Sequence, residues 1–187
     1  IRRPPRSTRK ESSAASDVYK RQVLDLAQKV KEAVHLAQLD NGQVIFVDKT
    51  LSTNQYETLA RIGEVAPAYC TGVGKAMLAF IGSKRLEIAL KQQSYHAYTS
   101  NTHTSPEALY IELKEIQKSG LAFDREEHEK GIISIASPIC ADNGSLIGAL
   151  SIATSTNRHD INSLKEFTSL IEKTAQEISA DAAAWHF

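Results

Sequence analysis

The sequence has little of several residue types that mark whole classes of protein. Only two of its 187 residues are cysteine, Cys70 and Cys140. Two cysteines are too few for a disulfide framework, and no paired spacing around them fits a structural zinc site. No apolar run approaches the roughly eighteen residues of a membrane-spanning helix, and the first residues lack the apolar core of a signal peptide. We therefore expect a cytoplasmic protein with no membrane association, no metal and no cofactor.

Net charge is also missing, because 22 Lys and Arg residues balance 22 Asp and Glu residues. The balance hides an asymmetry along the chain. Residues 1–22 carry seven basic and two acidic residues, a net charge of +5, and the remaining 165 carry fifteen basic and twenty acidic residues, a net charge of −5. A mildly acidic body does not suit a polyanion, so we do not expect it to bind nucleic acid through its own surface.

Residues 1–22 differ from the rest of the chain in composition as well as in charge. They contain almost no apolar residues and follow no helix or strand period, which is typical of disorder. One interpretation is a basic arm for nucleic acid. The other is a non-native segment, because these residues resemble the translated read-through of a sequencing-library adaptor. The sequence therefore predicts two parts, residues 1–22 and a single domain over residues 23–187.

From residue 23 onward, strands and helices are expected in separate blocks. The turns at Asn41-Gly42 and Asn143-Gly144 each lie between β-rich runs, a pattern that predicts two hairpins. The expected strands are 33–39, 44–47, 56–62, 121–123, 131–140 and 146–154. The expected helices begin at Val23, with Val34 in the apolar stripe, and after Thr71, and run from Ser83 to Leu90, from Pro106 to Gly120 and over 160–182. Thr104 and Glu107 have the spacing of a capping box at the start of the Pro106 helix. Segregated, mostly antiparallel strands covered by helices indicate the α+β class.

The stretch around Thr71-Gly72-Val73-Gly74 is the most informative part of the chain. Thr71 is a good N-cap residue, whose hydroxyl we expect to accept a hydrogen bond from the next turn. The two glycines leave the first backbone N–H groups of the helix without side-chain cover, which predicts a small-anion site. A tight turn or a close helix-to-sheet contact is the alternative. Neither the P-loop nor the dinucleotide motif fits, because Ala76 and Met77 stand where those motifs need Ser or Thr and Gly. A carboxylate or sugar-acid ligand suits the stretch better than a nucleotide.

A second informative stretch is the charged segment from Phe123 to Gly131. It can be a solvated loop, or it can direct Asp124 into a pocket together with the hydroxyls of Ser134 and Ser151 on neighbouring strands. Buried serines that bond only to backbone are the alternative for those two hydroxyls. The loop around His96 and His103 is a poor chelate, because seven residues separate the two imidazoles, so we expect no metal there.

Two other kinds of function stay open at this point. Cys70 lies just before a helix N-terminus, where the helix dipole lowers a thiol pKa, so a small hydrolase or transferase is possible in principle. No His or Asn partner for the thiol can be identified, so we do not expect an enzyme. The other alternative is an interaction module whose pocket is filled by its own side chains.

Three runs together resemble a known family. They are Pro67-Ala-Tyr-Cys-Thr-Gly-Val-Gly-Lys-Ala-Met-Leu-Ala79, Phe123-Asp-Arg-Glu-Glu-His-Glu-Lys-Gly131, and Ile135-Ala-Ser-Pro-Ile139 followed by Gly148-Ala-Leu-Ser-Ile152. They closely resemble the C-terminal effector-binding domain of IclR-type bacterial transcription regulators, in the same order, from about Val23 to about Ala182. The resemblance implies a GAF-like or profilin-like sensor fold, with a curved antiparallel sheet flanked by helices and a pocket on one face.

The resemblance also implies roles for particular residues and for the whole chain. Gly72 and Val73 would contact a small carboxylate through backbone amides, and the other ligand-binding positions would be Thr71, Asp124, Ser134, Ser151, Ala153, Tyr56, Leu59 and Ala66. Ala153 stands where some relatives have a hydroxyl, so the effector does not carry over. The expected function is small-molecule sensing within a homodimer or homotetramer. DNA would be bound only through a winged helix-turn-helix domain that this chain lacks.

Overall fold

Two glycine-containing turns set the register of the sheet. Asn41 and Gly42 both have positive φ angles, of 47° and 77°, as a two-residue type I′ hairpin turn requires. The second hairpin turns at Gly144, with φ of 80°, and its register shifts between Ile139 and Cys140. Both hairpins were predicted at these positions, and the structure confirms them.

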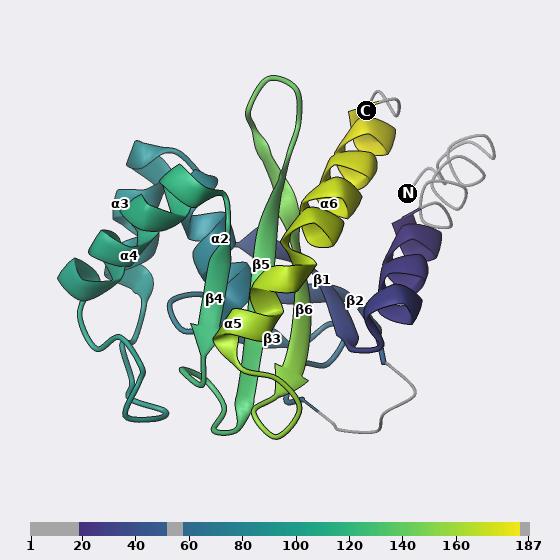
Figure 1. Cartoon of the computed structure of the whole chain (residues 1–187). Coiled ribbons are helices and arrows are strands. Elements are labelled where there is room, and N and C mark those ends of the chain that lie inside the picture. Colours follow the sequence, from purple (N-terminus) through teal and green to yellow (C-terminus); the bar gives the residue numbers. More distant parts are fainter. Residues whose placement is uncertain (1–18, 52–57, 184–187) are drawn as a thin grey trace, which may run out of the picture.

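The computed structural model describes residues 19–51 and 58–183, and in this part of the chain six antiparallel strands form one curled sheet (Figure 1). The strand order is β3-β2-β1-β6-β5-β4. The strands are β1 (Ala33–Asp40), β2 (Gln43–Thr50), β3 (Val65–Pro67), β4 (Ala122–Arg125), β5 (Ile132–Cys140) and β6 (Leu146–Ser155). The helices are residues 19–30, α2 (Gly72–Phe80), α3 (Ser83–Gln92), α4 (Pro106–Ser119), α5 (Ile161–Leu164), the 3₁₀ turn η1 (Lys165–Phe167) and α6 (Thr168–Ala183).

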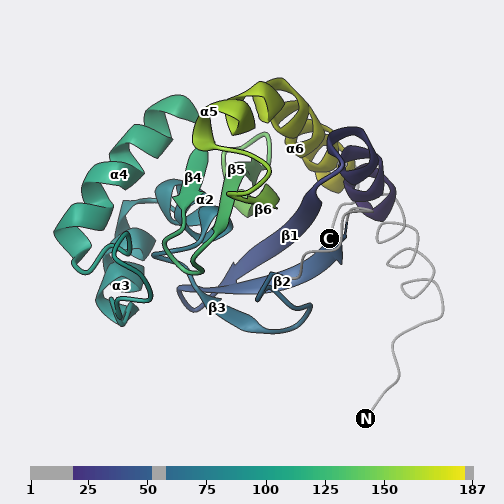
Figure 2. The ribbon, with the colours of Figure 1, turned by 60° about the horizontal axis from the view of Figure 1, so that its bottom comes forward.

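Helices cover both faces of the sheet, so the expected α+β class and curved antiparallel sheet are confirmed (Figure 2). Side chains alternate between the faces along each strand. On β6, Leu150 and Ile152 pack with the helix of residues 19–30 and with α6, and Ala149 packs with α2, α3 and α4. The two faces therefore have separate cores. No helix in the described ranges is long and apolar enough to cross a membrane.

The helix ends follow the local sequence closely, with small shifts. Helix α4 has Pro106 in its first turn and ends at Gly120, which has a φ of 75°, as predicted. Its N-cap is Ser105, whose hydroxyl accepts from the Ala108 amide at 3.2 Å, and not the predicted Thr104. The N-cap position of α3 is Gly82, so Ser83 begins that helix instead of capping it.

Four further expectations are corrected by the structure. The first helix is already formed at residue 19 and ends at residue 30, where Lys31 takes a φ of 57°, so Val34 belongs to β1. Residues 58–62 form no strand, because the third strand is the three-residue β3. The last helix is interrupted by η1. The expected disorder of residues 1–22 is wrong for residues 19–22, which are helical, and the remainder, residues 1–18, lies outside the described residues.

Candidate functional site

The floor of the candidate site is made by one face of four adjacent strands. The strand register places Asp124 of β4 opposite Ser134 of β5, and Ser134 opposite Ala153 of β6. In the next row, Ser151 of β6 lies opposite His35 of β1. Because residues of one row point to the same side of a sheet, the polar side chains of both rows face the same space. The apolar neighbours Ile133, Ile135, Leu150 and Ile152 point to the opposite face.

Helix α2 begins directly over this floor. A Cβ atom on Gly72 would come within 2.4 Å of the Ser134 hydroxyl oxygen and 3.7 Å of the Asp124 Cβ atom. Gly72 therefore allows the helix start to lie against β4 and β5. Glycine is required at position 74 by a different contact, because a Cβ atom there would lie 2.4 Å from the Ala68 carbonyl oxygen. The helix-to-sheet contact that the sequence left open as an alternative is thus real, and it lies beside a cavity.

The first backbone amides of α2 are open toward that cavity. The first helical hydrogen bond is donated by the Lys75 amide to the Thr71 carbonyl at 2.9 Å. Among the described residues, none accepts a hydrogen bond from the amides of Gly72 or Val73. Thr71 occupies the N-cap position as expected, but its hydroxyl donates back to the Pro67 carbonyl at 2.9 Å and caps no amide. Because Thr71 caps no amide, the N-terminus of α2 is more available to an anion than the sequence predicted.

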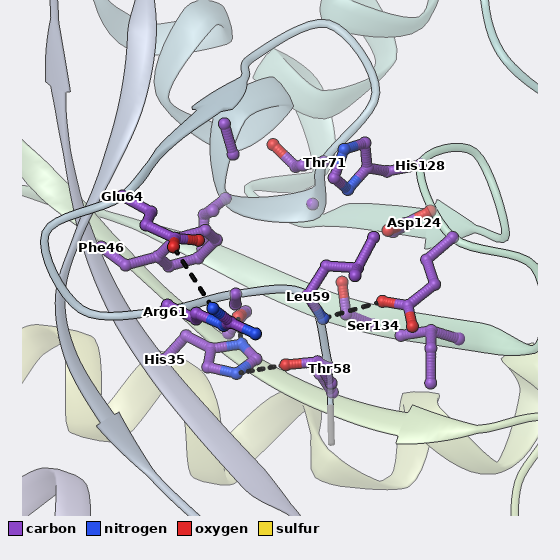
Figure 3. Close-up of a pocket in the computed structure, with 18 of the residues that line it drawn as sticks. His35, Phe46, Thr58, Leu59, Arg61, Glu64, Thr71, Asp124, His128 and Ser134 are labelled. Atoms are coloured by element: carbon purple, nitrogen blue, oxygen red, sulfur yellow. Dashed lines mark hydrogen bonds and ion pairs between the residues drawn. The ribbon is translucent and has the colours of Figure 1, made fainter. Parts of the chain in front are cut away.

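A cavity of about 270 Å³ lies between the α2 start, the sheet floor and the segment before β3 (Figure 3). This size suits a small organic molecule and lies just below the usual range for drug-sized ligands. The interpretation of a pocket filled by side chains does not fit a cavity of this size. Both polar and apolar side chains line it. The lining residues are His35, Phe46, Thr58, Leu59, Ala60, Arg61, Glu64, Val65, Ala66, Thr71, Gly72, Val73, Asp124, His128, Glu129, Ile132, Ser134, Ser151 and Ala153.

Most of the residues singled out from the sequence meet in this cavity. Thr71, Gly72, Val73, Asp124, Ser134, Ser151, Ala153, Leu59 and Ala66 all line it. Leu59 was expected to point inward but is 59% exposed, so it lies at the mouth. Tyr56 lies outside the described residues. The sequence did not single out His35, Phe46, Thr58 and His128 as site residues, and these four come from four different segments.

Asp124 is the buried acid of the site. Its side chain is 7% exposed, and its Oδ1 atom accepts a hydrogen bond from the Glu127 amide at 2.8 Å. Burial, followed by the negative charge of Glu127, raises the pKa of Asp124 to about 7. The Glu127 amide and the Lys75 ammonium only partly oppose this shift. Asp124 can therefore hold or release a proton near neutral pH.

His35 lies at the other end of the floor and is uncharged. Its Nδ1 atom is 3.4 Å from the Ser151 hydroxyl and its Nε2 atom is 3.4 Å from the Thr58 hydroxyl. Its ring packs edge-on against Phe46, with 5.5 Å between the ring centroids. Burial and the nearby charge of Lys49 lower the pKa of His35 to about 3. Figure 3 shows His35 and Thr58 on the side of the pocket away from Thr71 and His128.

The segment before β3 crosses the mouth of the cavity and is tied down on both sides. Lys49 donates to the Ala60 carbonyl at 2.8 Å, and the Leu59 amide donates to the Glu129 carboxylate at 3.0 Å. Arg61 and Glu64 form an exposed ion pair at 3.7 Å on the same segment. The charged residues of the site therefore lie mainly at its rim.

A separate charged cluster lies beside the pocket, on the far side of the same helix start. Lys75 is fully buried, and its ammonium contacts Glu127 at 2.5 Å and Glu112 at 2.9 Å. Glu112 also pairs with Arg125 at 2.9 Å and contacts His103. Burial alone would raise the pKa of Glu112, but the bond to His103 and the charge of Lys75 outweigh it and lower the pKa to about 2.

His103, Glu112 and Glu127 bring their ligand atoms within 4.8 Å of one another, as metal ligands do. The Lys75 ammonium bonds to two of these three groups, at the place where a cation would bind. A divalent ion would have to displace a buried positive charge, so this donor set does not fit a metal. The argument against a metal at this cluster is therefore the positive charge of Lys75, which already bonds Glu112 and Glu127. His96 lies elsewhere in the loop, edge-on against Tyr98.

Cys70 does not have the environment of a nucleophile. It is fully buried, and burial followed by the negative charges of Asp124 and Glu127 raises the pKa of its thiol. A reactive thiol needs the opposite shift. The expectation that the helix dipole lowers this pKa is therefore wrong, and the alternative of a Cys70-dependent hydrolase or transferase loses its basis.

Comparison with known proteins gives a consistent result. The family model for the C-terminal domain of the bacterial transcriptional regulator IclR matches residues 12–180. The HTH-type transcriptional regulator KdgR of Escherichia coli K12 is 33% identical over 159 residues, which cover 85% of this chain and 60% of KdgR. The chain spans between 54% and 62% of the length of three such curated relatives.

Solved structures share the same fold. The structure of the Thermotoga maritima IclR protein has a TM-score of 0.85 and 30% identity, covering 90% of this chain and 68% of that one. An IclR homologue from Microbacterium hydrocarbonoxydans, complexed with 4-hydroxybenzoate, has a TM-score of 0.80 and 24% identity, covering 92% of this chain and 69% of that one. At that identity the likeness extends to the fold alone.

Proposed function

This chain belongs to the IclR family of bacterial transcriptional regulators, as a C-terminal domain, and from that premise we propose that it binds a small organic acid as its effector. The relatives are named as regulators and not as enzymes, which agrees with the inert surroundings of Cys70. The acid is of the hydroxy, keto or sugar-acid kind, with its carboxylate at the start of α2.

The observation that carries this proposal is the open helix terminus. The amides of Gly72 and Val73 lie at the N-terminal end of α2, where the helix dipole favours negative charge. None of the described residues accepts their hydrogen bonds, although both residues line the cavity. A carboxylate placed there satisfies both amides, and the Ser134 hydroxyl lies beside it.

Asp124 adapts the same end of the pocket to an acid. A fully ionised carboxylate beside the ligand would repel it, but the pKa of Asp124 is raised to about 7. When Asp124 is protonated it can donate to the ligand carboxylate, and when it is ionised it accepts from a ligand hydroxyl. The neutral Ser151 hydroxyl is available to further hydroxyl or keto groups.

The solved neighbour supports this class of ligand by its chemistry. A protein of the same fold was crystallised with 4-hydroxybenzoate, which is a small monocarboxylate with one hydroxyl. Its modest identity does not transfer the compound itself to this chain. Aromatic hydroxy acids therefore join sugar acids in the set of compounds to be tested.

The effector acts through assembly and through DNA binding elsewhere in the full-length protein. The chain spans only part of its curated relatives, which are named HTH-type regulators, and in this proposal DNA is bound by a part of the protein other than this domain. In this proposal the domain forms a homodimer or homotetramer, and the ligand shifts the packing between copies. A coupling of about 1–3 kcal/mol between the two sites is enough for such regulation.

Isothermal calorimetry with a panel of sugar acids, 2-keto acids and hydroxybenzoates tests the proposal. We expect the wild type to bind at least one acid, and Gly72→Val to lose at least about tenfold in affinity, because its side chain enters the space beside Ser134. Ala108→Val is the matched control, since it adds similar bulk to the exposed first turn of α4. Equal binding by wild type and Gly72→Val would reject the amide site.

A further inference from the structure

A second polar group lies in the same cavity, away from the amides of α2. It consists of His35, Thr58 and Ser151, which come from β1, the segment before β3, and β6. His35 joins the two hydroxyls through its two ring nitrogens, at 3.4 Å each. We refer to these three residues as the distal triad. A carboxylate bound at the amides of Gly72 and Val73 contacts neither His35 nor Thr58, so the presence of these two residues beside Ser151 needs its own explanation.

The distal triad is uncharged. His35 is held neutral because burial and the charge of Lys49 lower its pKa to about 3. A neutral imidazole donates from one nitrogen and accepts at the other, and a hydroxyl does both. Both contacts of the ring are long for hydrogen bonds, so either hydroxyl can turn toward a ligand at little cost. The triad can thus donate to or accept from a neutral ligand group.

The position of the distal triad sets the length of the ligand. Ser134 lies on β5 and His35 on β1, and β6 separates these two strands. Two strand spacings amount to roughly 10 Å across the floor. Hydrogen bonds of about 3 Å at each end leave roughly 4 Å or more between the polar ends of the ligand. Pyruvate and similarly short acids can reach Ser151, on the strand next to Ser134, but they cannot reach His35.

Charge argues against a second carboxylate at this end. The cation that acts on His35 is Lys49, and its ammonium already donates to the main-chain carbonyls of Thr58 and Ala60. Lys49 does not line the cavity. Arg61 also lines the cavity, but it is exposed and pairs with Glu64 at 3.7 Å. A carboxylate brought to the distal triad would lose its water and meet three neutral side chains there, which is unfavourable. A ligand hydroxyl carries no such penalty.

We propose that His35, Thr58 and Ser151 select an acid that carries an uncharged hydroxyl at the end opposite its carboxylate, in preference to a dicarboxylate of the same length. This inference rests on the proposed function, because it assumes that the carboxylate occupies the amides of Gly72 and Val73. It adds the distal triad as the part of the pocket that determines which acid is accepted.

Calorimetry with two sets of matched compounds tests the selection. The aromatic set is 4-hydroxybenzoate, benzoate and terephthalate, and the aliphatic set is gluconate and glucarate. In the set that the wild-type pocket binds, we expect the hydroxyl compound to bind at least about tenfold more tightly than the dicarboxylate. The same preference is expected over benzoate, because an unmatched polar site rejects a ligand that lacks its hydroxyl. Comparison of the two sets distinguishes an aromatic from a sugar-acid effector.

Variants then assign the preference to the distal triad. In each protein the relevant quantity is the affinity for the hydroxyl compound divided by the affinity for the matched dicarboxylate. In His35→Leu we expect this ratio to fall to within about threefold, while the affinity for the dicarboxylate stays unchanged. His35→Gln keeps a neutral donor and acceptor and should retain most of the ratio. Ser151→Ala should lower the ratio, whereas Ser137→Ala, a buried serine of β5 that does not line this cavity, should not. Because each ratio is measured within one variant, a general loss of stability does not imitate the effect.

These measurements distinguish failure of the distal-triad proposal from failure of the proposed function. If acids bind and depend on Gly72, but terephthalate or glucarate binds as well as its hydroxyl partner, the distal-triad proposal is overturned and the amide site stands. An unchanged ratio in His35→Leu overturns it as well. If no compound of either set binds the wild type, the proposed function fails, and this inference fails with it.

Discussion

The pocket and the ion-pair cluster both adjoin the first turns of α2, but they differ in how completely their polar groups are paired. In the cluster, Lys75 bonds two carboxylates and Glu112 has three partners, although the buried Glu127 Oε2 atom has no hydrogen-bond partner among the described residues. In the pocket, the amides of Gly72 and Val73 have no acceptor among the described residues. Buried polar groups are normally satisfied within a protein, so the unpaired set is the one left for a ligand.

The same difference appears in the pKa shifts. Partners in the cluster lower the pKa of Glu112 to about 2, which favours its charged form. Burial without a cationic partner of its own raises the pKa of Asp124 to about 7. Glu127 links the two regions, because it accepts from Lys75 and its amide donates to Asp124. The comparison indicates that the cluster stabilises the start of α2, and that the pocket is kept ready for binding.

The largest effect is expected from breaking the cluster. Lys75→Met leaves Glu127 as a buried charge without its cation, and we expect a loss of about 3–5 kcal/mol in the free energy of unfolding. Chemical denaturation measures this loss. The double variant Lys75→Met, Glu127→Gln removes the stranded charge and should recover about half of it. If Lys75→Met lowered the free energy of unfolding by less than about 1 kcal/mol, the cluster would not stabilise the fold, and the contrast with the pocket would be lost.

A smaller effect of opposite sign is expected from Asp124→Asn. The folded-state pKa of about 7 lies above the ordinary 3.8, so the ionised form is disfavoured in the fold. The stability that depends on protonated Asp124 is present below pH 4 and is lost as the pH rises through 7. At pH 8 we expect Asp124→Asn to be more stable than wild type by about 2–4 kcal/mol, and near pH 4 to be equal to it.

Denaturation of both proteins at the two pH values gives this difference directly. Asp142→Asn, in the exposed turn between β5 and β6, is the control and should change nothing at either pH. If Asp124→Asn were less stable than wild type at pH 8, Asp124 would be an ordinary paired acid and the pocket would resemble the cluster.

The smallest effect on stability is expected inside the pocket. The Ser134 hydroxyl has no hydrogen-bond partner among the described residues. Removing it in Ser134→Ala should therefore change the free energy of unfolding by less than about 1 kcal/mol, while weakening the binding of an acid severalfold. Melting curves and calorimetry on the same sample measure the two effects. A large loss of stability with unchanged binding would give Ser134 a structural role.

Local sequence patterns were sufficient for much of the fold and for one end of the site. The Asn41-Gly42 turn, the Pro106 start and the Gly120 end of α4 each have a short-range physical cause that can be read from neighbouring residues. The start of α2 is equally local, since the glycines and the helix define it. The third strand was misplaced because β3 has only three residues, too few for an alternating pattern.

Long-range contacts explain what the sequence did not reveal. His35 lies between the apolar residues Val34 and Leu36 of β1. A polar residue between two apolar neighbours was the only sign in the sequence that His35 belongs to the pocket. Its partner Ser151 is 116 residues away. The contact between Lys75 and Glu127 spans 52 residues, and no local pattern marks it. The distal end of the pocket and the cluster therefore depend on the sheet register, which brings distant segments together.

The central claim is that the amides of Gly72 and Val73 receive the carboxylate of a small acid. Titration of ¹⁵N-labelled protein with the best-binding acid, followed by two-dimensional ¹H–¹⁵N spectra, tests it most directly. We predict that the Gly72 and Val73 amide protons move downfield and show the largest shifts in the spectrum, with Asp142 and its turn unchanged. Saturable binding that leaves these two amides unshifted would contradict the account.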